Sequence, residues 1–154
     1  MRIWQHLRHS RGYGVHSPML YRIVREAMMP REVVGADRRL FDELFSKGVG
    51  KRTATRLQNL CTIQHYPTWS VDAMAEEGGL TILTPDCAES VVRDAAEGLA
   101  KQEGVVVVLR SITDRRRRTL CRELVRMHHS MSAERPTMLL LFARHDLRKQ
   151  HIII

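Results

Sequence analysis

A strand–helix–strand pattern occupies residues 80–109, which read LTILTPDCAESVVRDAAEGLAKQEGVVVVL. Residues 80–84 have the composition of a short strand, and residues 105–109 form a continuous apolar run, which is typical of a strand covered on both faces. The intervening helix is expected to open within residues 84–86. Its inner face is predicted from apolar residues at helical spacing, namely Val91, Val92, Ala95, Ala96 and Leu99.

The same rhythm continues to the end of the chain. A helix is expected over residues 114–128, a central strand over residues 137–142, and a last strand over residues 150–154. Residues 69–74 fit either a short strand or a short helix. Together these elements predict the α/β class, with a small, mostly parallel sheet of three to four strands and flanking helices.

The first part of the chain is predicted to be helical. A helix is expected over residues 18–28, and a second is expected to begin at Asp37, which can cap it, and to end at Gly48. A third is expected over residues 51–61. We therefore expect a single domain over residues 1–154, with a helical N-terminal part (residues 1–65) and an α/β part (residues 80–154).

Composition narrows the function classes. No apolar run approaches the roughly 18 residues that cross a bilayer, so the protein is expected to be cytoplasmic and not bound to a membrane. Cys61, Cys87 and Cys121 are widely spaced and fit neither a disulfide framework nor a metal motif. The eight histidines also lack the spacing of a ligand set, so no metal site is predicted.

The formal net charge of +8 is unevenly distributed. Counting Lys and Arg against Asp and Glu, residues 1–60 carry +7, residues 61–109 carry −6 and residues 110–154 carry +7. Two basic segments therefore flank an acidic one. Such a pattern either makes a positive face for a polyanion or lets the segments neutralise one another.

Both ends of the chain carry motifs of one enzyme family. Residues 9–28 read HSRGYGVHSPMLYRIVREAM, and residues 138–154 read MLLLFARHDLRKQHIII. These segments resemble the termini of a group of bacterial class I S-adenosylmethionine-dependent methyltransferases. The resemblance implies a partial Rossmann-like fold in which residues 80–154 form the family's final third: strand, helix, strand, helix, two last strands and a tail.

The part that the family needs for catalysis is missing. Between Pro30 and Gly79 no strand is followed by the Gly-rich turn that lets backbone amides approach a cofactor. Where the resemblance implies acidic residues at the strand ends, this chain has Thr84, Arg110 and Ser111. Thr84 is interpreted as a helix cap and Arg110 as a solvated loop residue.

Resemblance and departures together predict a degenerate, non-catalytic methyltransferase-like protein that acts as a binding module. It is expected to have no catalytic residue and no cofactor, S-adenosylmethionine being implied by resemblance only. Its partner would be a protein or a polyanion such as nucleic acid. An open alternative is a methyltransferase that is active only as an oligomer. A homodimer through an exposed sheet edge or an apolar helix face is expected.

A second alternative comes from residues 45–57, FSKGVGKRTATRL. They resemble the hairpin of helix-hairpin-helix DNA-binding motifs, in which a Gly-hydrophobic-Gly turn exposes backbone amides to a phosphate. The same residues also fit a helix C-cap followed by a tight turn. The nucleic-acid-binding residues predicted by the first interpretation are Gly48, Gly50, Lys51, Arg52 and Arg56.

Overall fold

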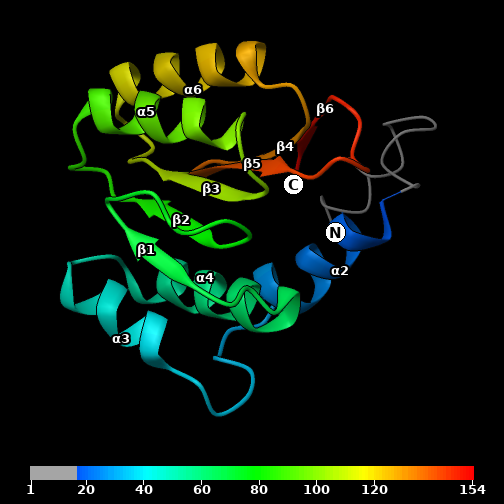
Figure 1. Ribbon diagram of the computed structural model, residues 1–154. Helices are drawn as coiled ribbons and strands as arrows, with labels where there is room; N and C mark the ends of the chain where they lie inside the picture. The colour runs from blue at the N-terminus through cyan, green and yellow to red at the C-terminus, as the bar shows by residue number, and fades with distance from the viewer. Residues whose placement is uncertain (1–16) are drawn as a thin grey trace. The chain divides into compact units, whose positions relative to one another are not determined.

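The computed structural model describes residues 17–154, so residues 9–16 of the N-terminal segment lie outside the described residues (Figure 1). The chain divides into two compact units, Met1–Tyr66 and Pro67–Ile154. This boundary falls at the end of the helical part predicted for residues 1–65. The single domain expected over residues 1–154 stays a prediction.

The first helix of the N-terminal unit follows the predicted pattern. It begins as α2 (Pro18–Ile23) and continues as the π-helical segment η2 (Val24–Met28). The hydroxyl of Ser17 accepts a hydrogen bond of 3.2 Å from the amide of Leu20, as expected for an N-cap beside a proline. The apolar residues that recur at helical spacing within this segment form one buried stripe: Leu20, Ile23, Val24, Ala27 and Met28.

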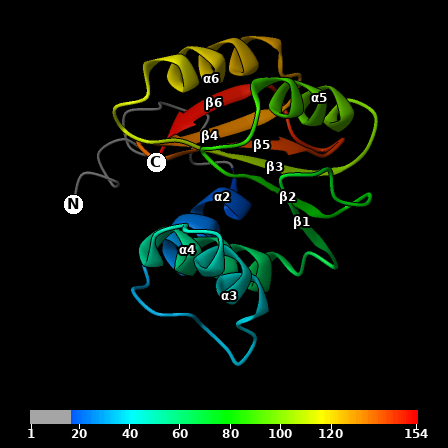
Figure 2. The ribbon, with the colours of Figure 1, turned by 90° about the vertical axis from the view of Figure 1, so that its left-hand side faces the viewer.

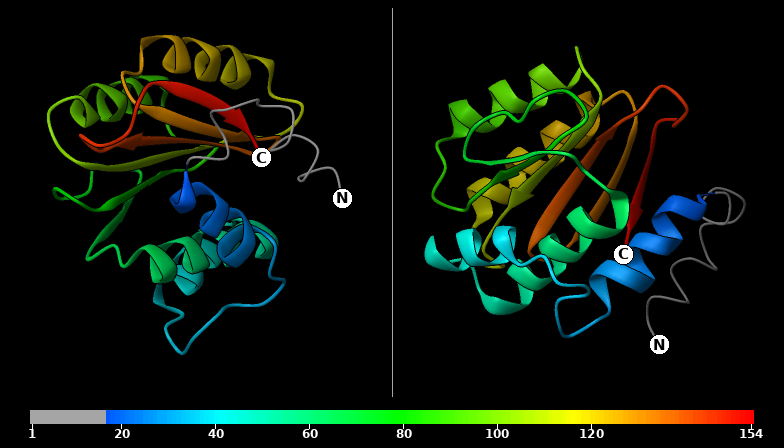
Figure 3. Two further views of the ribbon diagram at one scale, coloured as in Figure 1. Left: turned by 90° about the vertical axis from the view of Figure 1, so that its right-hand side faces the viewer. Right: turned by 60° about the horizontal axis from the view of Figure 1, so that its bottom comes forward.

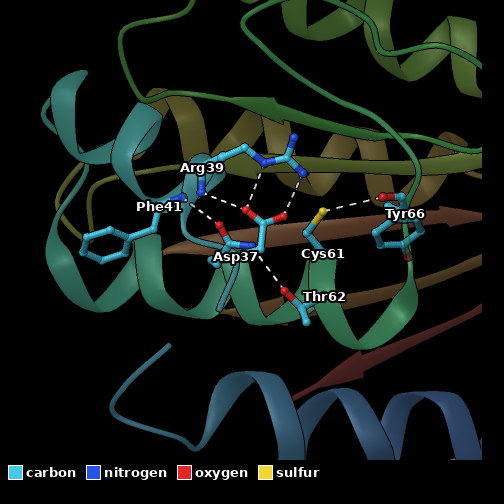
Figure 4. A network of polar contacts seen from close by, with 7 residues as sticks. Asp37, Arg39, Phe41, Cys61, Thr62 and Tyr66 are labelled. Atoms are coloured by element: carbon cyan, nitrogen blue, oxygen red, sulfur yellow. Dashed lines mark hydrogen bonds and ion pairs between the residues drawn. The ribbon is translucent and has the colours of Figure 1, made fainter. Parts of the chain in front are cut away.

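Two further helices pack against each other in this unit, α3 (Arg39–Ser46) and α4 (Lys51–Gln64) (Figure 3). Asp37 lies two residues before α3, where its carboxylate accepts from the amide and the guanidinium of Arg39 (Figure 4). The hydrogen bonds from Arg39 lower the pKa of Asp37 to about 2. Helix α4 extends beyond the predicted end at residue 61. It ends at Gln64, because the next residue, His65, adopts the left-handed conformation that terminates a helix.

The second unit contains a six-stranded mixed sheet with the order β1-β2-β3-β5-β4-β6 (Figures 1 and 2). Neighbouring strands are parallel at three of the five junctions, whereas β5 runs antiparallel to both β3 and β4. The strands are β1 (Trp69–Val71), β2 (Leu80–Leu83), β3 (Gly104–Leu109), β4 (Met131–Arg135), β5 (Met138–Ala143) and β6 (Gln150–Ile153).

The prediction of three to four strands was too small. The sequence analysis missed β4, because its residues Met131-Ser-Ala-Glu-Arg135 are too polar to be recognised as a strand. Only the ladders that β4 forms with β5 and β6 make this segment extended. Strand β1 resolves the open interpretation of residues 69–74 in favour of a strand.

Two helices cover one face of this sheet, α5 (Glu89–Leu99) and α6 (Arg115–Met127) (Figures 1 and 2). Their inner residues pack with alternate residues of the central strands, a core that includes Val92, Leu99, Val106, Leu124 and Leu141. Residues Val105 to Leu109 are all buried, as the apolar run predicts. No helix in the described part of the chain is long and apolar enough to span a membrane.

Helix α5 begins later than expected. Its N-cap is Ala88, so the predicted opening within residues 84–86 was wrong. The carbonyl of Thr84 instead closes a turn by accepting from the amide of Cys87 at 3.0 Å. Helix α6 begins where expected, because the carboxylate of Asp114 accepts from the amide of Arg117 at 2.9 Å.

Candidate functional site

The carboxyl ends of parallel strands are the usual ligand edge of an α/β sheet, and in this chain Asp72 occupies the end of β1. Its carboxylate accepts hydrogen bonds from the amide and the hydroxyl of Thr84, at 2.7 and 2.9 Å. Thr84 directly follows β2 and is buried. The interpretation of Thr84 as a helix cap was therefore wrong, since its hydroxyl joins the ends of β1 and β2.

Arg117 fills the neighbouring space between the ends of β2 and β3. Its guanidinium donates to the carbonyl of Leu109 at 3.2 Å, to that of Cys87 at 3.0 Å, and to that of Thr84. The side chain reaches this position because it lies on the inner side of α6, where Arg117 is only 6% exposed. Three of the five N–H donors of Arg117 therefore bind carbonyls, and the chain itself closes the part of this edge between β2 and β3.

Arg110 is likewise structural. It follows β3, is buried, and pairs with Glu134 on β4 at 2.8 Å. Its guanidinium also donates to the carbonyls of Pro136 at 3.0 Å and Arg135 at 3.3 Å. The interpretation of Arg110 as a solvated loop residue was therefore wrong, because the β4–β5 turn, which the sequence analysis did not predict, folds over it.

A chain of polar contacts continues from Glu134 across the edge strand. The ring Nε2 of His151 lies 3.0 Å from a Glu134 carboxylate oxygen, and its Nδ1 lies 2.8 Å from the hydroxyl of Ser132. Ser132 and His151 face each other in the β4·β6 ladder, which explains their proximity. Hydrogen bonding by His151 and the charge of Arg110 lower the pKa of Glu134. Ser132 is 2% exposed, so the arrangement anchors β6 and does not present a nucleophile.

A cavity of about 630 Å³ lies at the opposite edge of the sheet. It is lined by residues at the ends of α5, α6 and β5, among them Leu99, Met127 and Ala143. Three of the histidines, His128, His129 and His145, also line it. Within residues 17–154, no group of three or more His, Cys, Asp or Glu side chains is placed to hold a metal ion.

The predicted hairpin residues Gly48 and Gly50 lie between α3 and α4. Gly48 has a φ of +85°. Its amide donates a hydrogen bond to the carbonyl of Phe45, and the amide of Val49 donates one to the carbonyl of Leu44. These two bonds form a Schellman motif, so the alternative of a helix C-cap is realised. Gly50 is the N-cap of α4, and no side chain caps the amides of the first turn.

The three predicted basic residues of the hairpin differ in what they contact. The guanidinium of Arg52 donates to the carbonyls of Met29 and Pro30, each at 3.1 Å, and that of Arg56 donates to Met28, also at 3.1 Å. Both arginines therefore bind the end of η2. Lys51 is exposed at the first position of α4.

A basic hollow lies beside this turn. It has a volume of about 460 Å³ and is lined by Arg31, Lys51 and Arg52. The first turn of α4 carries no acidic residue that would neutralise these cations or the positive end of the helix dipole. Arg31 could not be predicted as part of this hollow, because it lies 20 residues before Lys51 and shares no sequence motif with it.

Comparison of the chain with protein-family models, with curated proteins and with solved structures finds no match.

Helix α3, which precedes the hairpin, carries a pair of stacked aromatic rings. The rings of Phe41 and Phe45 stack at a centroid distance of 5.9 Å, and the guanidinium of Arg38 lies 4.6 Å from the centre of the Phe41 ring. Phe45 remains 58% exposed. The last turn of α3 therefore presents an aromatic face close to the glycine turn.

The buried cysteine thiols show no sign of activation. Burial raises the pKa of Cys61 to about 11 and also raises the pKa of Cys121. A thiol that stays protonated is a poor nucleophile. Cys61 and Cys121 therefore serve as small apolar residues of the core.

Proposed function

We propose that this protein is a non-catalytic binding module built on a remnant of a class I methyltransferase-type domain. Part of the support is the order of elements in the second unit, which runs β2, α5, β3, α6, β4 and β5. The family resemblance of the chain's ends implies the same order of strand, helix, strand, helix and two strands, followed by a tail. Strand β6 lies in that tail.

The observation that carries the non-catalytic proposal is the closed carboxyl edge of the sheet. Arg117 occupies the space between the ends of β2 and β3, and Asp72 is committed to Thr84. A cofactor-binding edge needs free backbone amides and a free acidic group for the ribose. The groups at this edge are bonded to one another instead.

Calorimetric titration with S-adenosylmethionine tests this proposal. We expect no saturable heat at millimolar ligand, at protein concentrations both below and above any self-association measured by light scattering. Saturable binding at every concentration would contradict the proposal, because a cofactor site would survive in a single chain. Saturable binding only above the association threshold would contradict it in favour of a methyltransferase completed by a second subunit.

We propose nucleic acid as the partner class, bound at the turn formed by Gly48, Gly50 and Lys51. The supporting observation is the hollow lined by Arg31, Lys51 and Arg52, beside the start of α4, whose N-cap Gly50 has no side chain to bind the first amides. Backbone amides and cations placed together suit a phosphate group. Arg52 and Arg56 support this site indirectly, because they hold η2 against α4.

The test is a binding titration of the full chain, freed of co-purified nucleic acid, with fluorescently labelled DNA and RNA. The double variant Arg31→Glu/Lys51→Glu should weaken binding to every sequence. It should also make the slope of log affinity against log salt concentration shallower by about 2. Lys101→Glu/Arg148→Glu is the matched control, since it changes the charge equally at two exposed positions of the other unit. Equal affinities for the hairpin variant and the unaltered chain would refute this site.

A further inference from the structure

Helix α6 carries an unusual concentration of arginine. Six of its thirteen residues are arginines, and the structure separates them into different roles. Arg117 is buried at the strand ends, and the guanidinium of Arg118 donates to the carbonyl of Ile112. The other four, Arg115, Arg116, Arg122 and Arg126, are exposed.

Three of these exposed residues form a single row. Arg115, Arg122 and Arg126 are separated by seven and four positions, so at 100° per residue they lie within a narrow sector of the helix surface. We call these three residues the arginine stripe. The row is about 16 Å long, because each helical residue rises about 1.5 Å. It lies opposite Leu120, Cys121 and Leu124, which pack in the core against the sheet.

The stripe is not neutralised by its surroundings. Within residues 17–154, no carboxylate forms an ion pair with Arg115, Arg122 or Arg126. The one acidic residue of α6, Glu123, is already bound at 2.8 Å by Arg93 of α5. Three like charges in a row repel one another without a counter-charge, so the stripe lacks a structural explanation within the described part of the chain.

We propose that the arginine stripe binds the phosphate backbone of a nucleic-acid duplex. This inference rests on the proposed partner class but concerns a different surface, on the other unit from the Gly48 turn. Guanidinium groups bind phosphate through paired N–H donors, and a rigid row of them matches a rigid row of phosphates. Each phosphate contact also releases counterions, which drives binding at low salt.

The composition of α6 favours a duplex over other polyanions. Binding of single strands relies on aromatic side chains on which bases stack, and α6 contains none. A helix that binds an anionic membrane inserts an apolar face, and the apolar face of α6 is already buried in the core. Backbone recognition of a duplex needs only the exposed charges.

The experiment compares duplex binding by the full-length chain and its variants. Arg115→Glu/Arg122→Glu should bind a labelled DNA or RNA duplex at least about tenfold more weakly at low salt and reduce the salt slope by about 2. Both positions are exposed, and a glutamate at the first position of a helix suits its dipole, so the variant should fold. Arg115→Lys/Arg122→Lys keeps the charges and should retain most of the affinity.

Lys101→Glu/Arg148→Glu is again the control for net charge. If it weakens binding as much as the stripe variant does, only net charge matters and the inference is overturned. It is also overturned if the stripe variant binds duplexes like the unaltered chain, or if that chain prefers single strands or vesicles of anionic lipid to duplexes.

Comparison with Arg31→Glu/Lys51→Glu separates this inference from the proposed function. If only the stripe variant loses affinity, the stripe is the binding surface and the Gly48 turn is not. If only the hairpin variant loses affinity, the proposed function stands and the stripe fails. If both variants lose affinity, the two surfaces both contribute.

Discussion

The guanidinium of Arg110 and the carboxylate of Glu134 form an ion pair of 2.8 Å, although the two residues are 24 positions apart. Arg110 leaves the end of β3, and Glu134 lies on β4, which β5 separates from β3 in the sheet. Arg110 is 7% exposed and Glu134 is 19% exposed at the side chain. The pair therefore ties together strands that are not neighbours.

Removal of one member of this pair should destabilise the protein more than removal of both. We expect Glu134→Leu to cost about 3 kcal/mol of unfolding free energy, the lower part of the range for breaking a buried pair, because it leaves Arg110 uncompensated. The double variant Arg110→Met/Glu134→Leu should recover part of that loss. Urea denaturation measures all three values, and a double variant less stable than Glu134→Leu would argue against an uncompensated charge as the cause. The exposed Arg93–Glu123 pair is the control, with an expected effect of at most about 1 kcal/mol.

Stability should decrease with acidification in two stages. Burial lowers the pKa of His128, so the folded state resists a proton that the unfolded chain accepts, and stability falls as the pH drops below the ordinary value of 6.5. His151 and Arg110 lower the pKa of Glu134 in the folded protein. The ionised Glu134 therefore stabilises the protein above pH 4.5, the ordinary pKa of a glutamate, and this stabilisation is lost as the pH falls through the lower pKa of the folded state.

Denaturation midpoints measured from about pH 7 to about pH 2 would show both stages. His128→Gln should abolish the upper stage, whereas His129→Gln, at the exposed neighbouring position, should only reduce it slightly, because the charge of His129 is a minor cause of the lowered pKa of His128. An upper stage that persists in His128→Gln would assign it to another group.

Two glycines of the same turn should respond differently to alanine. Gly48 has a φ of +85°, so Gly48→Ala should cost about 1 kcal/mol. Gly50 has a φ of −58°, and a Cβ there would meet no atom within 4 Å, so Gly50→Ala should be almost neutral apart from a small loss of capping. Thermal unfolding of the two variants provides the comparison, and equal losses would mean that the left-handed conformation of Gly48 is not required.

Loss of Arg117 should be more damaging than loss of its neighbour. Arg117→Ala removes the donor to three carbonyls, two of them buried at the strand ends, and should cost about 2–4 kcal/mol. Arg116→Ala, at an exposed position, should change the unfolding free energy by less than about 0.5 kcal/mol. The same denaturation experiment decides, and similar losses for the two variants would remove Arg117 from its proposed structural role.

The three thiols should react at different rates with an alkylating dye in the folded protein. Cys87 is partly exposed, whereas Cys61 and Cys121 are buried, and burial raises the pKa of all three thiols. We expect Cys87 to be labelled first and the other two only after unfolding. Mass spectrometry of the labelled peptides identifies the order, and rapid labelling of Cys121 would show that the core beneath α6 opens.

Sequence reasoning located the elements whose patterns are local. The helix over residues 18–28, the helix near residues 114–128 and the strand at residues 105–109 depend on spacing within one segment, and the structure contains them. Strand β4 was not found, because its polar residues become a strand only through pairing with β5 and β6. The start of α5 was misplaced for a related reason, since a turn at Thr84 and a distant arginine hold that segment.

For the candidate sites, the residue types were visible in the sequence but their contacts were not. Thr84 and Arg110 could be located at predicted strand ends, yet their partners Asp72 and Glu134 are 12 and 24 positions away. Arg115 to Arg118 are contiguous in sequence, and in the folded helix Arg117 faces inward whereas Arg115 and Arg116 are exposed.

The α/β class, the helical first part, the helix end at Gly48 and the distribution of charge could all be predicted from the amino-acid sequence. These properties follow from periodicity, from backbone preferences and from composition, which act over a few residues. Only the tertiary structure decided which arginines are free. Arg52, Arg56, Arg110 and Arg117 bind carbonyls or carboxylates of distant segments, whereas Arg115, Arg122 and Arg126 face outward, because burial of a guanidinium requires partners that only the folded chain brings within reach.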